Sequence, residues 1–129
     1  MKNLCLKGKI FSGASKGAEF VRLPWVGKQI EEKLGFKPYP GTLNIRLNRD
    51  STKLRKTLET TEGIKVCPPE GFHAGKCFKA YMTNMPECAV VIPQVPRYPK
   101  SVVEIIAPVN LREEYSLKDG STIEIEIML

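Results

Sequence analysis

The segment Thr122-Ile123-Glu124-Ile125-Glu126-Ile127 carries the clearest secondary-structure signal in the chain. Isoleucine alternates with a polar or charged residue, and successive side chains of a β-strand point to opposite faces of a sheet. The pattern therefore predicts a half-buried strand at the C-terminal end. The range 42–48 alternates in the same way, with Leu43, Ile45 and Leu47 on one face, and predicts a second such strand.

Other segments indicate that strands dominate the rest of the chain. A first strand is expected over 4–11, and the apolar, β-branched runs 88–92 and 102–106 predict more deeply buried strands. The range 72–82 resembles a hairpin that turns at Gly75-Lys76. This set of strands favours a small closed β-barrel over a sandwich.

Helical signals are few. Pro24 is suited to begin a helix, and Gly35 is suited to end it. Asn110, followed three residues later by Glu113, resembles a capping box that opens a short helix. The range 51–59 predicts at most another turn or two. The fold class expected from these patterns is mainly β, with one or two short helices.

Size and composition indicate one compact domain over residues 1–129, because 42% of the residues are hydrophobic and 26% are charged. The net charge of +6 favours an anionic partner such as a nucleotide, a nucleic acid or a membrane surface. It does not choose among them, nor does it reject a basic protein without a special partner. No apolar run approaches the roughly 20 residues of a membrane helix, and the N-terminus has no signal-peptide core. We therefore expect a cytoplasmic protein.

The cysteines raise the question of a metal site. Cys67, His73, Cys77 and Cys88 could be read as zinc ligands, but the spacing C-x5-H-x3-C matches no closed structural zinc site. Without a secretory signal, disulfides are not the default either. We expect these cysteines and Cys5 to be buried or half-buried free thiols, and metal binding at this group stays open.

Two peptides in the first third of the chain combine backbone-shaping residues with polar side chains. In the stretch from Ser12 to Phe20, glycines let backbone N–H groups approach phosphates and Lys16 supplies charge. A glycine-rich turn without a ligand explains this stretch equally well. In Pro40-Gly41-Thr42-Leu43-Asn44, the side chains of Thr42 and Asn44 project together from one strand face. Their neutral oxygens suit Mg²⁺ beside nucleotide phosphates, but these residues alone favour a solvated polar face that Arg46 and Asn48 continue.

A third peptide runs from Glu104 to Arg112. Glu104 lies among valines and isoleucines, so its carboxylate needs a donor from the protein or from a ligand hydroxyl. Pro108 ends the strand, and Asn110 caps the next helix, whose first N–H groups beside Arg112 form a candidate anion or polar-base site. The alternatives are a plain helix cap for Asn110 and a surface salt bridge for Arg112. No nucleophile–base pair stands out, so the catalytic residues remain unassigned.

Together these peptides resemble the archaeal CTP-dependent riboflavin kinases over almost the whole chain. The likeness rests on Gly-Thr-Leu-Asn at 41–44 and Glu-Ile-Ile-Ala-Pro-x-x-Leu-Arg at 104–112, with support from 12–20, 34–40, 90–93 and 117–120. The resemblance implies a six-stranded cradle-loop β-barrel. It also implies transfer of the γ-phosphate of CTP to the 5′-hydroxyl of riboflavin, which yields FMN and CDP.

The resemblance implies roles for individual residues as well. Thr42 and Asn44 would hold Mg²⁺, and Glu104 would contact the flavin. Two sets of residues would bind the nucleotide, namely Ala14, Ser15, Lys16, Gly17, Ala18 and Glu19 in the first, and Val109, Asn110, Leu111 and Arg112 in the second. Two positions depart from the family pattern. Ser15 stands where relatives often have glycine, and Pro96 replaces a threonine that meets the flavin, although proline offers neither hydroxyl nor N–H.

Two other functions compete with this interpretation. The same fold could serve as a non-catalytic CTP- or flavin-sensing domain. A DNA-binding protein of the swapped-hairpin type would fit Leu117-Lys118-Asp119-Gly120 and the positive charge, but it leaves 41–44 and 104–112 unexplained. We expect CTP and riboflavin as partners, no membrane or nucleic-acid partner, and a monomer. The strictness of the preference for CTP over ATP is not apparent from the residues.

Overall fold

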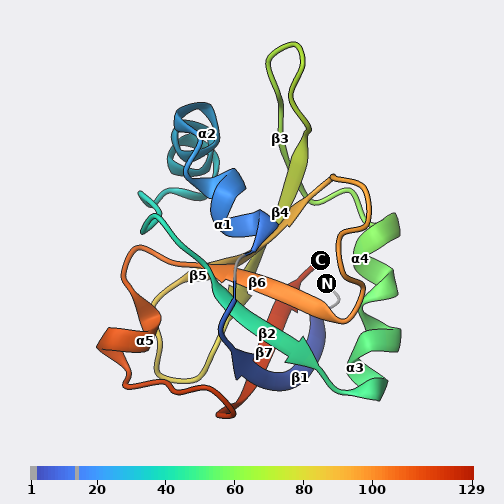
Figure 1. Ribbon diagram of the computed structural model, residues 1–129, viewed down its shortest axis with the longest axis vertical. Coiled ribbons are helices and arrows are strands. Elements are labelled where there is room, and N and C mark those ends of the chain that lie inside the picture. Colours follow the sequence, from blue (N-terminus) through green and yellow to red (C-terminus); the bar gives the residue numbers. More distant parts are fainter. Residues whose placement is uncertain (1–2, 14) are drawn as a thin grey trace.

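Seven strands form the framework of the computed structural model, which describes residues 3–13 and 15–129 (Figure 1). They are β1 (Asn3–Phe11), β2 (Leu43–Leu47), β3 (Ile64–Val66), β4 (Gly75–Tyr81), β5 (Cys88–Pro93), β6 (Val102–Ile106) and β7 (Thr122–Met128). Their order is β3-β4-β5-β6-β2-β1-β7, and β7 also pairs with β4. The last pairing closes six antiparallel strands into a barrel, which confirms the predicted fold, and β3 extends β4 outside the ring.

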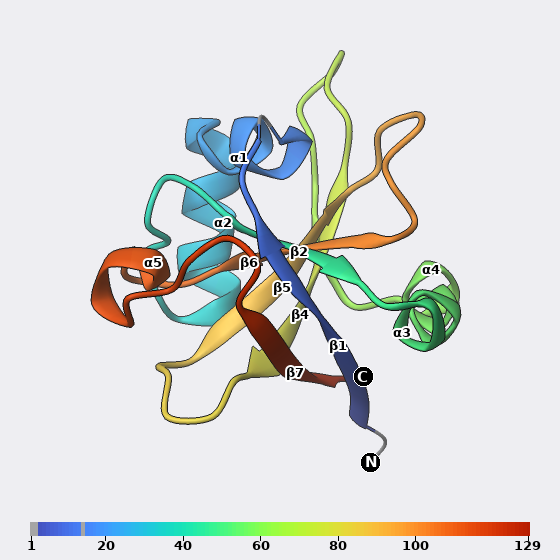
Figure 2. The same cartoon turned by 60° about the horizontal axis from the view of Figure 1, so that its bottom comes forward.

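The alternating strands behave as their sequences predict. β1 and β7 lie side by side (Figure 2), and each buries every second residue. Leu6, Ile125 and Ile127 are fully buried inside the barrel, while the charged residues between them face outward. Burial of one apolar row from each strand removes these side chains from water and sets the strand register.

A second core explains why most residues of β4, β5 and β6 are buried on both faces of the sheet. Their outer face is covered by α1 (Lys16–Val21) and α2 (Pro24–Leu34). Phe20, Val26 and Ile30 from these helices are buried there. The strands contribute Val66, Cys77, Ala89, Val91 and Ile106 to the same cluster. The continuous apolar runs of the sequence therefore mark strands that lie between the barrel interior and a helical layer.

The described residues hold five short helices, more than the one or two expected from the sequence. Besides α1 and α2 they are α3 (Arg49–Leu54), α4 (Lys56–Thr60) and α5 (Leu111–Glu114). The helix over 24–34 is confirmed, and Gly35 ends it with a φ of 84°. The unexpected helix is α1, because the stretch from Ser12 to Phe20 reads as a loop. Ser15 supplies its cap by accepting a hydrogen bond from the backbone N–H of Ala18 at 3.1 Å.

The hairpin turn predicted at Gly75-Lys76 is wrong. Gly75 and Lys76 lie inside β4, and the chain reverses between β3 and β4 through residues 67–74. A Cβ atom at Gly75 would lie 2.6 Å from the ring of Phe20. The glycine therefore permits close packing of α1 on the strand, whereas the sequence suggested a turn residue.

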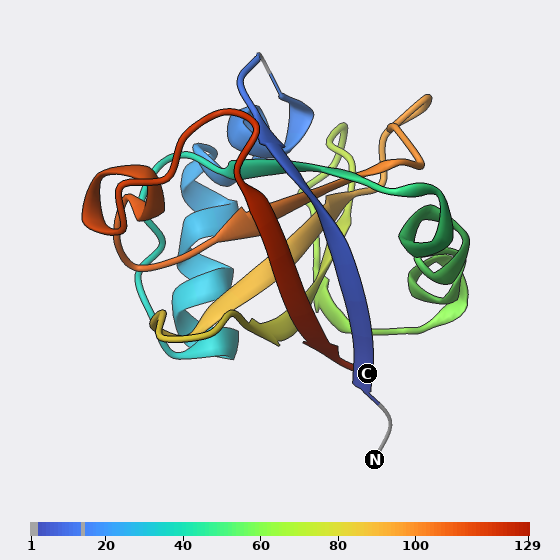
Figure 3. The same cartoon turned by 90° about the horizontal axis from the view of Figure 1, so that it is seen from below.

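Two buried cations hold α3 and α4 against the barrel, on the side opposite α2 (Figure 3). The Nζ of Lys76 donates to the carbonyl oxygens of Leu58, Glu59 and Thr61 at the end of α4. Arg55, which is 1% exposed, donates from Nε to the Val102 carbonyl at 2.8 Å and from Nη1 to Glu59 at 2.7 Å. These bonds fix both helices beside the loop that joins β5 to β6.

The four cysteines are free thiols, and only two are buried as expected. Burial raises the pKa of Cys77 and of Cys88 to about 12, whereas Cys5 and Cys67 are exposed. In the part of the chain that the structure describes, no three His, Cys, Asp or Glu side chains gather as a metal-binding group. None of the helices in these residues has the length and apolar character to span a membrane.

Candidate functional site

Strand register brings the polar residues of the two central peptides together. Phe11 of β1 pairs with Asn44 of β2, which in turn pairs with Glu104 of β6. Their neighbours Ile45 and Val103 belong to the interior core, so Asn44 and Glu104 point outward, beneath α1. Peptides about 60 residues apart in the sequence thus share one patch of the barrel wall.

Glu104 is the centre of this patch and is 1% exposed. Its Oε1 accepts a hydrogen bond from Thr42 Oγ1 at 2.7 Å. Its Oε2 accepts from the backbone N–H of Gly17 at 2.9 Å and from the hydroxyl of Tyr98. The expectation that this carboxylate needs donors is confirmed, and the protein itself supplies three. A direct contact between Glu104 and a flavin stays a prediction, because α1 and Tyr98 now enclose the carboxylate.

The first turn of α1 lies directly on Glu104. A Cβ atom at Gly17 would be 2.4 Å from the Glu104 carboxylate carbon, so only glycine fits at this approach. On the same helix, Lys16 and Glu19 are exposed and Ala18 is half-buried. Ala14, which the sequence also places in the nucleotide-binding stretch, lies outside the described residues.

Thr42, Asn44 and Ser15 form a cluster of oxygen atoms beside Glu104. The distance from Thr42 Oγ1 is 3.2 Å to Ser15 Oγ and 3.4 Å to Asn44 Oδ1. Thr42 has one hydroxyl proton, and its shortest contact directs that proton to Glu104. Ser15 must then be the donor to Thr42, and the Oγ1 of Thr42 faces Asn44 Oδ1 without a proton between them.

The burial of Asn44 decides between two interpretations of its strand. Asn44 is 7% exposed, so it is not part of a solvated polar face, whereas Arg46 on the same face is exposed. A buried amide oxygen that faces the lone pairs of a hydroxyl is unfavourable unless a cation or a donor completes the pair. The pair of oxygens therefore has the chemistry of a site for a hard cation.

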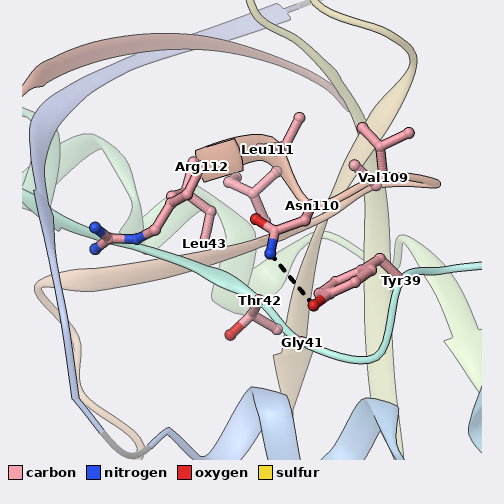
Figure 4. A pocket seen from close by; sticks show the side chains of 10 residues that line it. Tyr39, Gly41, Thr42, Leu43, Val109, Asn110, Leu111 and Arg112 are labelled. Carbon is pink, nitrogen blue, oxygen red and sulfur yellow. Dashed lines mark hydrogen bonds between the residues drawn. The ribbon is translucent and has the colours of Figure 1, made fainter. Parts of the chain in front are cut away.

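A pocket of about 140 Å³ adjoins this cluster and shares Thr42 with it (Figure 4). Leu43, Ile105, Ala107 and Leu111 give it an apolar lining, and its other lining residues are Tyr39, Gly41, Val109, Asn110 and Arg112. Asn110 and Tyr39 point toward each other, and Asn110 Nδ2 donates to the Tyr39 hydroxyl at 3.2 Å. The pocket thus combines an apolar floor with a few placed polar groups, as small-molecule sites do.

Asn110 and Arg112 fix α5 at this pocket. The Oδ1 of Asn110 accepts from the Glu113 backbone N–H at 3.3 Å, which confirms the predicted cap. The Nη2 of Arg112 donates to the Phe11 carbonyl and to Ser12 Oγ, both at 3.1 Å, and to Asp119 at 2.5 Å. The hydrogen bond from Arg112 lowers the pKa of Asp119, and the one from Ser12 acts in the same direction. Arg112 therefore joins α5 to the end of β1.

Three residues of the site escaped sequence reasoning. Tyr39 precedes the Pro40-Gly41 bend, which could have directed attention to it. Asp119 lies in the peptide 117–120, which supported the family resemblance without a role for this residue. Tyr98 carries no local signal, since it lies in an irregular segment between β5 and β6. Pro96 is exposed in the same segment.

Comparisons with known proteins relate the chain to one family. Residues 10–127 match the family model of the CTP-dependent riboflavin kinase domain, described as a domain of unknown function, DUF120. A riboflavin kinase of Archaeoglobus fulgidus is 40% identical over 96% of the chain and 54% of its own length. One of Pyrobaculum aerophilum is 43% identical over 96% and 60%, and one of Sulfurisphaera tokodaii is 39% identical over 99% and 98%.

The relatives differ in how much of their length this chain covers. The chain spans only about half to three-fifths of the first two relatives' length, whereas it matches the third almost from end to end. The family model covers the oxygen cluster, the pocket and nearly all of the strands, except for the first seven residues of β1 and the last residue of β7. Because the match runs from residue 10 to residue 127, the chain belongs to the CTP-dependent riboflavin kinase family.

Proposed function

We propose that the protein transfers the γ-phosphate of CTP to the 5′-hydroxyl of riboflavin, giving FMN and CDP. The observation that carries the proposal is the junction of the oxygen cluster and the pocket at Thr42. A base held in the pocket would extend its phosphates toward Thr42 and Asn44. Phosphoryl transfer depends mainly on positioning and charge neutralisation, which this arrangement is suited to provide.

The oxygen cluster fits Mg²⁺. Two oxygens that bind one Mg²⁺ at right angles lie about 3 Å apart, and Thr42 Oγ1 and Asn44 Oδ1 are 3.4 Å apart. Both are neutral, which suits a cation whose anionic ligands come from nucleotide phosphates. Bound there, Mg²⁺ would offset the negative charge of the phosphate groups. Thr42 and Asn44 are the residues that we assign to hold it.

Other residues of the chain have complementary roles in this proposal. Lys16 is exposed at the first turn of α1, where its ammonium group can approach the phosphates. Arg112 is held by Asp119 and the end of β1, so its charge stands at the border of the pocket. The flavin would lie near α1 and the segment that contains Pro96, on the side of Glu104 away from the pocket.

The pocket suggests how cytosine is selected. Asn110 Oδ1 is occupied by the N–H of Glu113, so its amide group must present Nδ2 to Tyr39. The Tyr39 hydroxyl accepts that bond and keeps its own proton for an acceptor in the pocket. Cytosine offers acceptors at O2 and N3, whereas uracil shares the acceptor at O2 but carries a proton at N3. A Tyr39 donor directed at N3 would therefore favour cytosine over uracil.

A direct assay tests the function. Purified protein with CTP, Mg²⁺ and riboflavin is expected to form FMN and CDP, measured by chromatography, and ATP is expected to serve poorly. Tight binding of CTP or riboflavin without turnover would favour the sensing domain instead. Strong, salt-sensitive binding of duplex DNA, without turnover, would favour the DNA-binding alternative.

The replacement Tyr39→Phe tests the selection of cytosine. We expect the ratio of kcat/KM for CTP to that for UTP to fall roughly three- to tenfold, because one neutral hydrogen bond to the base is lost. Isothermal titration with CDP and UDP should show the same loss of preference. Tyr81→Phe is the matched control, since Tyr81 is 49% exposed on β4 and lies outside the pocket. An unchanged ratio in Tyr39→Phe would remove Tyr39 from the recognition of the base.

A further inference from the structure

We propose that Tyr98 is a positioning residue that acts through Glu104 to orient the hydroxyl group of Thr42 for metal binding. The inference rests on the proposed function, which places a metal ion at Thr42 and Asn44. Tyr98 itself would touch neither the metal nor the substrates. Its effect passes along three side chains, from the Tyr98 hydroxyl to Glu104 Oε2 and from Glu104 Oε1 to the Thr42 hydroxyl.

The surroundings of Tyr98 hold its hydroxyl in the role of donor. Tyr98 is 9% exposed, and its pKa is raised by burial and by the negative charge of Glu104. The phenol therefore keeps its proton, and the carboxylate can only accept it. The guanidinium of Arg55 lies 5.9 Å from the centre of the Tyr98 ring, at the outer range of a cation–π contact. Since Arg55 is bonded to the Val102 carbonyl, the ring rests on a fixed support.

The consequence for Thr42 follows from counting protons. The Tyr98 hydroxyl and the Gly17 N–H fix Oε2 of Glu104 from two directions, which leaves Oε1 directed at Thr42. Oε1 then takes the single hydroxyl proton of Thr42, so the free lone pair of Thr42 Oγ1 must point toward Asn44 Oδ1. A threonine whose proton instead pointed at Asn44 would present that proton to a cation. Tyr98 thus decides which side of the Thr42 oxygen a metal meets.

This arrangement has the form of an outer partner that orients a metal ligand. Such partners commonly change metal affinity or activity by about ten- to a hundredfold when they are removed. It also connects the segment between β5 and β6, where Tyr98 and Pro96 lie, to the oxygen cluster below α1. A ligand that moves this segment would alter the orientation of Thr42 at the same time.

The experiment measures metal binding apart from turnover. The CDP complexes of wild type, Tyr98→Phe, Glu104→Gln and the double variant are titrated with Mn²⁺ and monitored by electron paramagnetic resonance. We expect Tyr98→Phe to bind Mn²⁺ roughly ten- to a hundredfold more weakly, with CDP affinity measured without metal unchanged. Tyr98→Phe in the Glu104→Gln background should have little further effect, because both changes interrupt one relay. Tyr81→Phe is the control, and thermal melting verifies the fold of each variant.

The outcomes separate the inference from the function on which it rests. Unchanged Mn²⁺ affinity in Tyr98→Phe, or an equal effect of this change in the wild-type and Glu104→Gln backgrounds, would overturn the relay while wild-type turnover leaves the function intact. Absence of turnover and of Mn²⁺ binding in the wild type would overturn both. If Tyr98→Phe does not fold, Glu104→Gln tests the relay at its second side chain. Its amide must reduce Mn²⁺ affinity by a similar factor, since one side-chain acceptor is replaced by a donor.

Discussion

Replacing Gly17 with alanine is expected to reduce kcat/KM for CTP by roughly a hundredfold or more. The new Cβ atom would lie 2.4 Å from the carboxylate carbon of Glu104, a distance that two non-bonded carbons cannot adopt. Either the first turn of α1 or the Glu104 side chain must move. In both cases the N–H of Gly17 loses its 2.9 Å bond to Oε2. The orientation of Thr42 and the placement of Lys16 would change together, which is why the effect is large.

The same change should also lower stability. Forcing extra volume into a packed site costs about 1–3 kcal/mol, to be measured as a shift in the urea unfolding midpoint. Gly27→Ala in α2 is a matched control. The nearest atom to its Cβ would be the Val21 carbonyl oxygen at 3.9 Å, so the methyl group fits. Alanine there should stabilise the helix by about 0.5–1 kcal/mol. Wild-type kinetics in Gly17→Ala would show that α1 does not need its present contact with Glu104.

Removing the hydroxyl of Thr42 should give the second large effect. Thr42→Val preserves the shape of the side chain, deletes one proposed metal ligand and leaves Glu104 Oε1 without its 2.7 Å donor. We expect kcat to fall roughly a hundredfold, and the Mg²⁺ concentration required for half-maximal rate to rise by a similar factor. Steady-state rates measured across a series of Mg²⁺ concentrations provide both values.

Thr42→Ser distinguishes loss of the hydroxyl from damage to the fold. Serine keeps the oxygen and the proton that Glu104 accepts, so most of the activity and of the Mg²⁺ response should return. Thr42→Val should leave a buried acceptor without one donor, at a cost of about 1–3 kcal/mol in the free energy of unfolding. If the valine and serine variants respond to Mg²⁺ alike, Thr42 is not a metal ligand.

Much of the barrel could be predicted because periodicity is a local property. The alternation at 122–127 and 42–48 identified β7 and β2, and the apolar runs identified the strands that α1 and α2 cover. Two predictions of local structure failed because glycine occurs both in turns and at sites of close packing. Gly75 suggested a turn, yet it serves the close contact with Phe20. The glycines near Ser15 suggested a loop, yet the serine caps a helix there.

The candidate site was predictable only in part, for a related reason. Thr42, Asn44, Glu104 and Asn110 stand out because each places a polar group where local rules expect an apolar or solvated one. Tyr39 and Tyr98 do not stand out, since a tyrosine in an irregular segment is ordinary. Their importance comes from partners that are distant in the sequence or set by the fold, Asn110 and Glu104 respectively.

The amino-acid pattern alone was enough to establish the strands, the helix over 24–34, the cap at Asn110 and the need of Glu104 for donors. These features depend on side-chain period, backbone preference and the cost of burying charge, all of which act over a few neighbouring residues. The folded chain alone assigned those donors to Thr42, Gly17 and Tyr98, and turned Asn44 from a surface residue into a buried one. Barrel closure is the physical reason, because it joins residues through strand register and packing that no local stretch encodes.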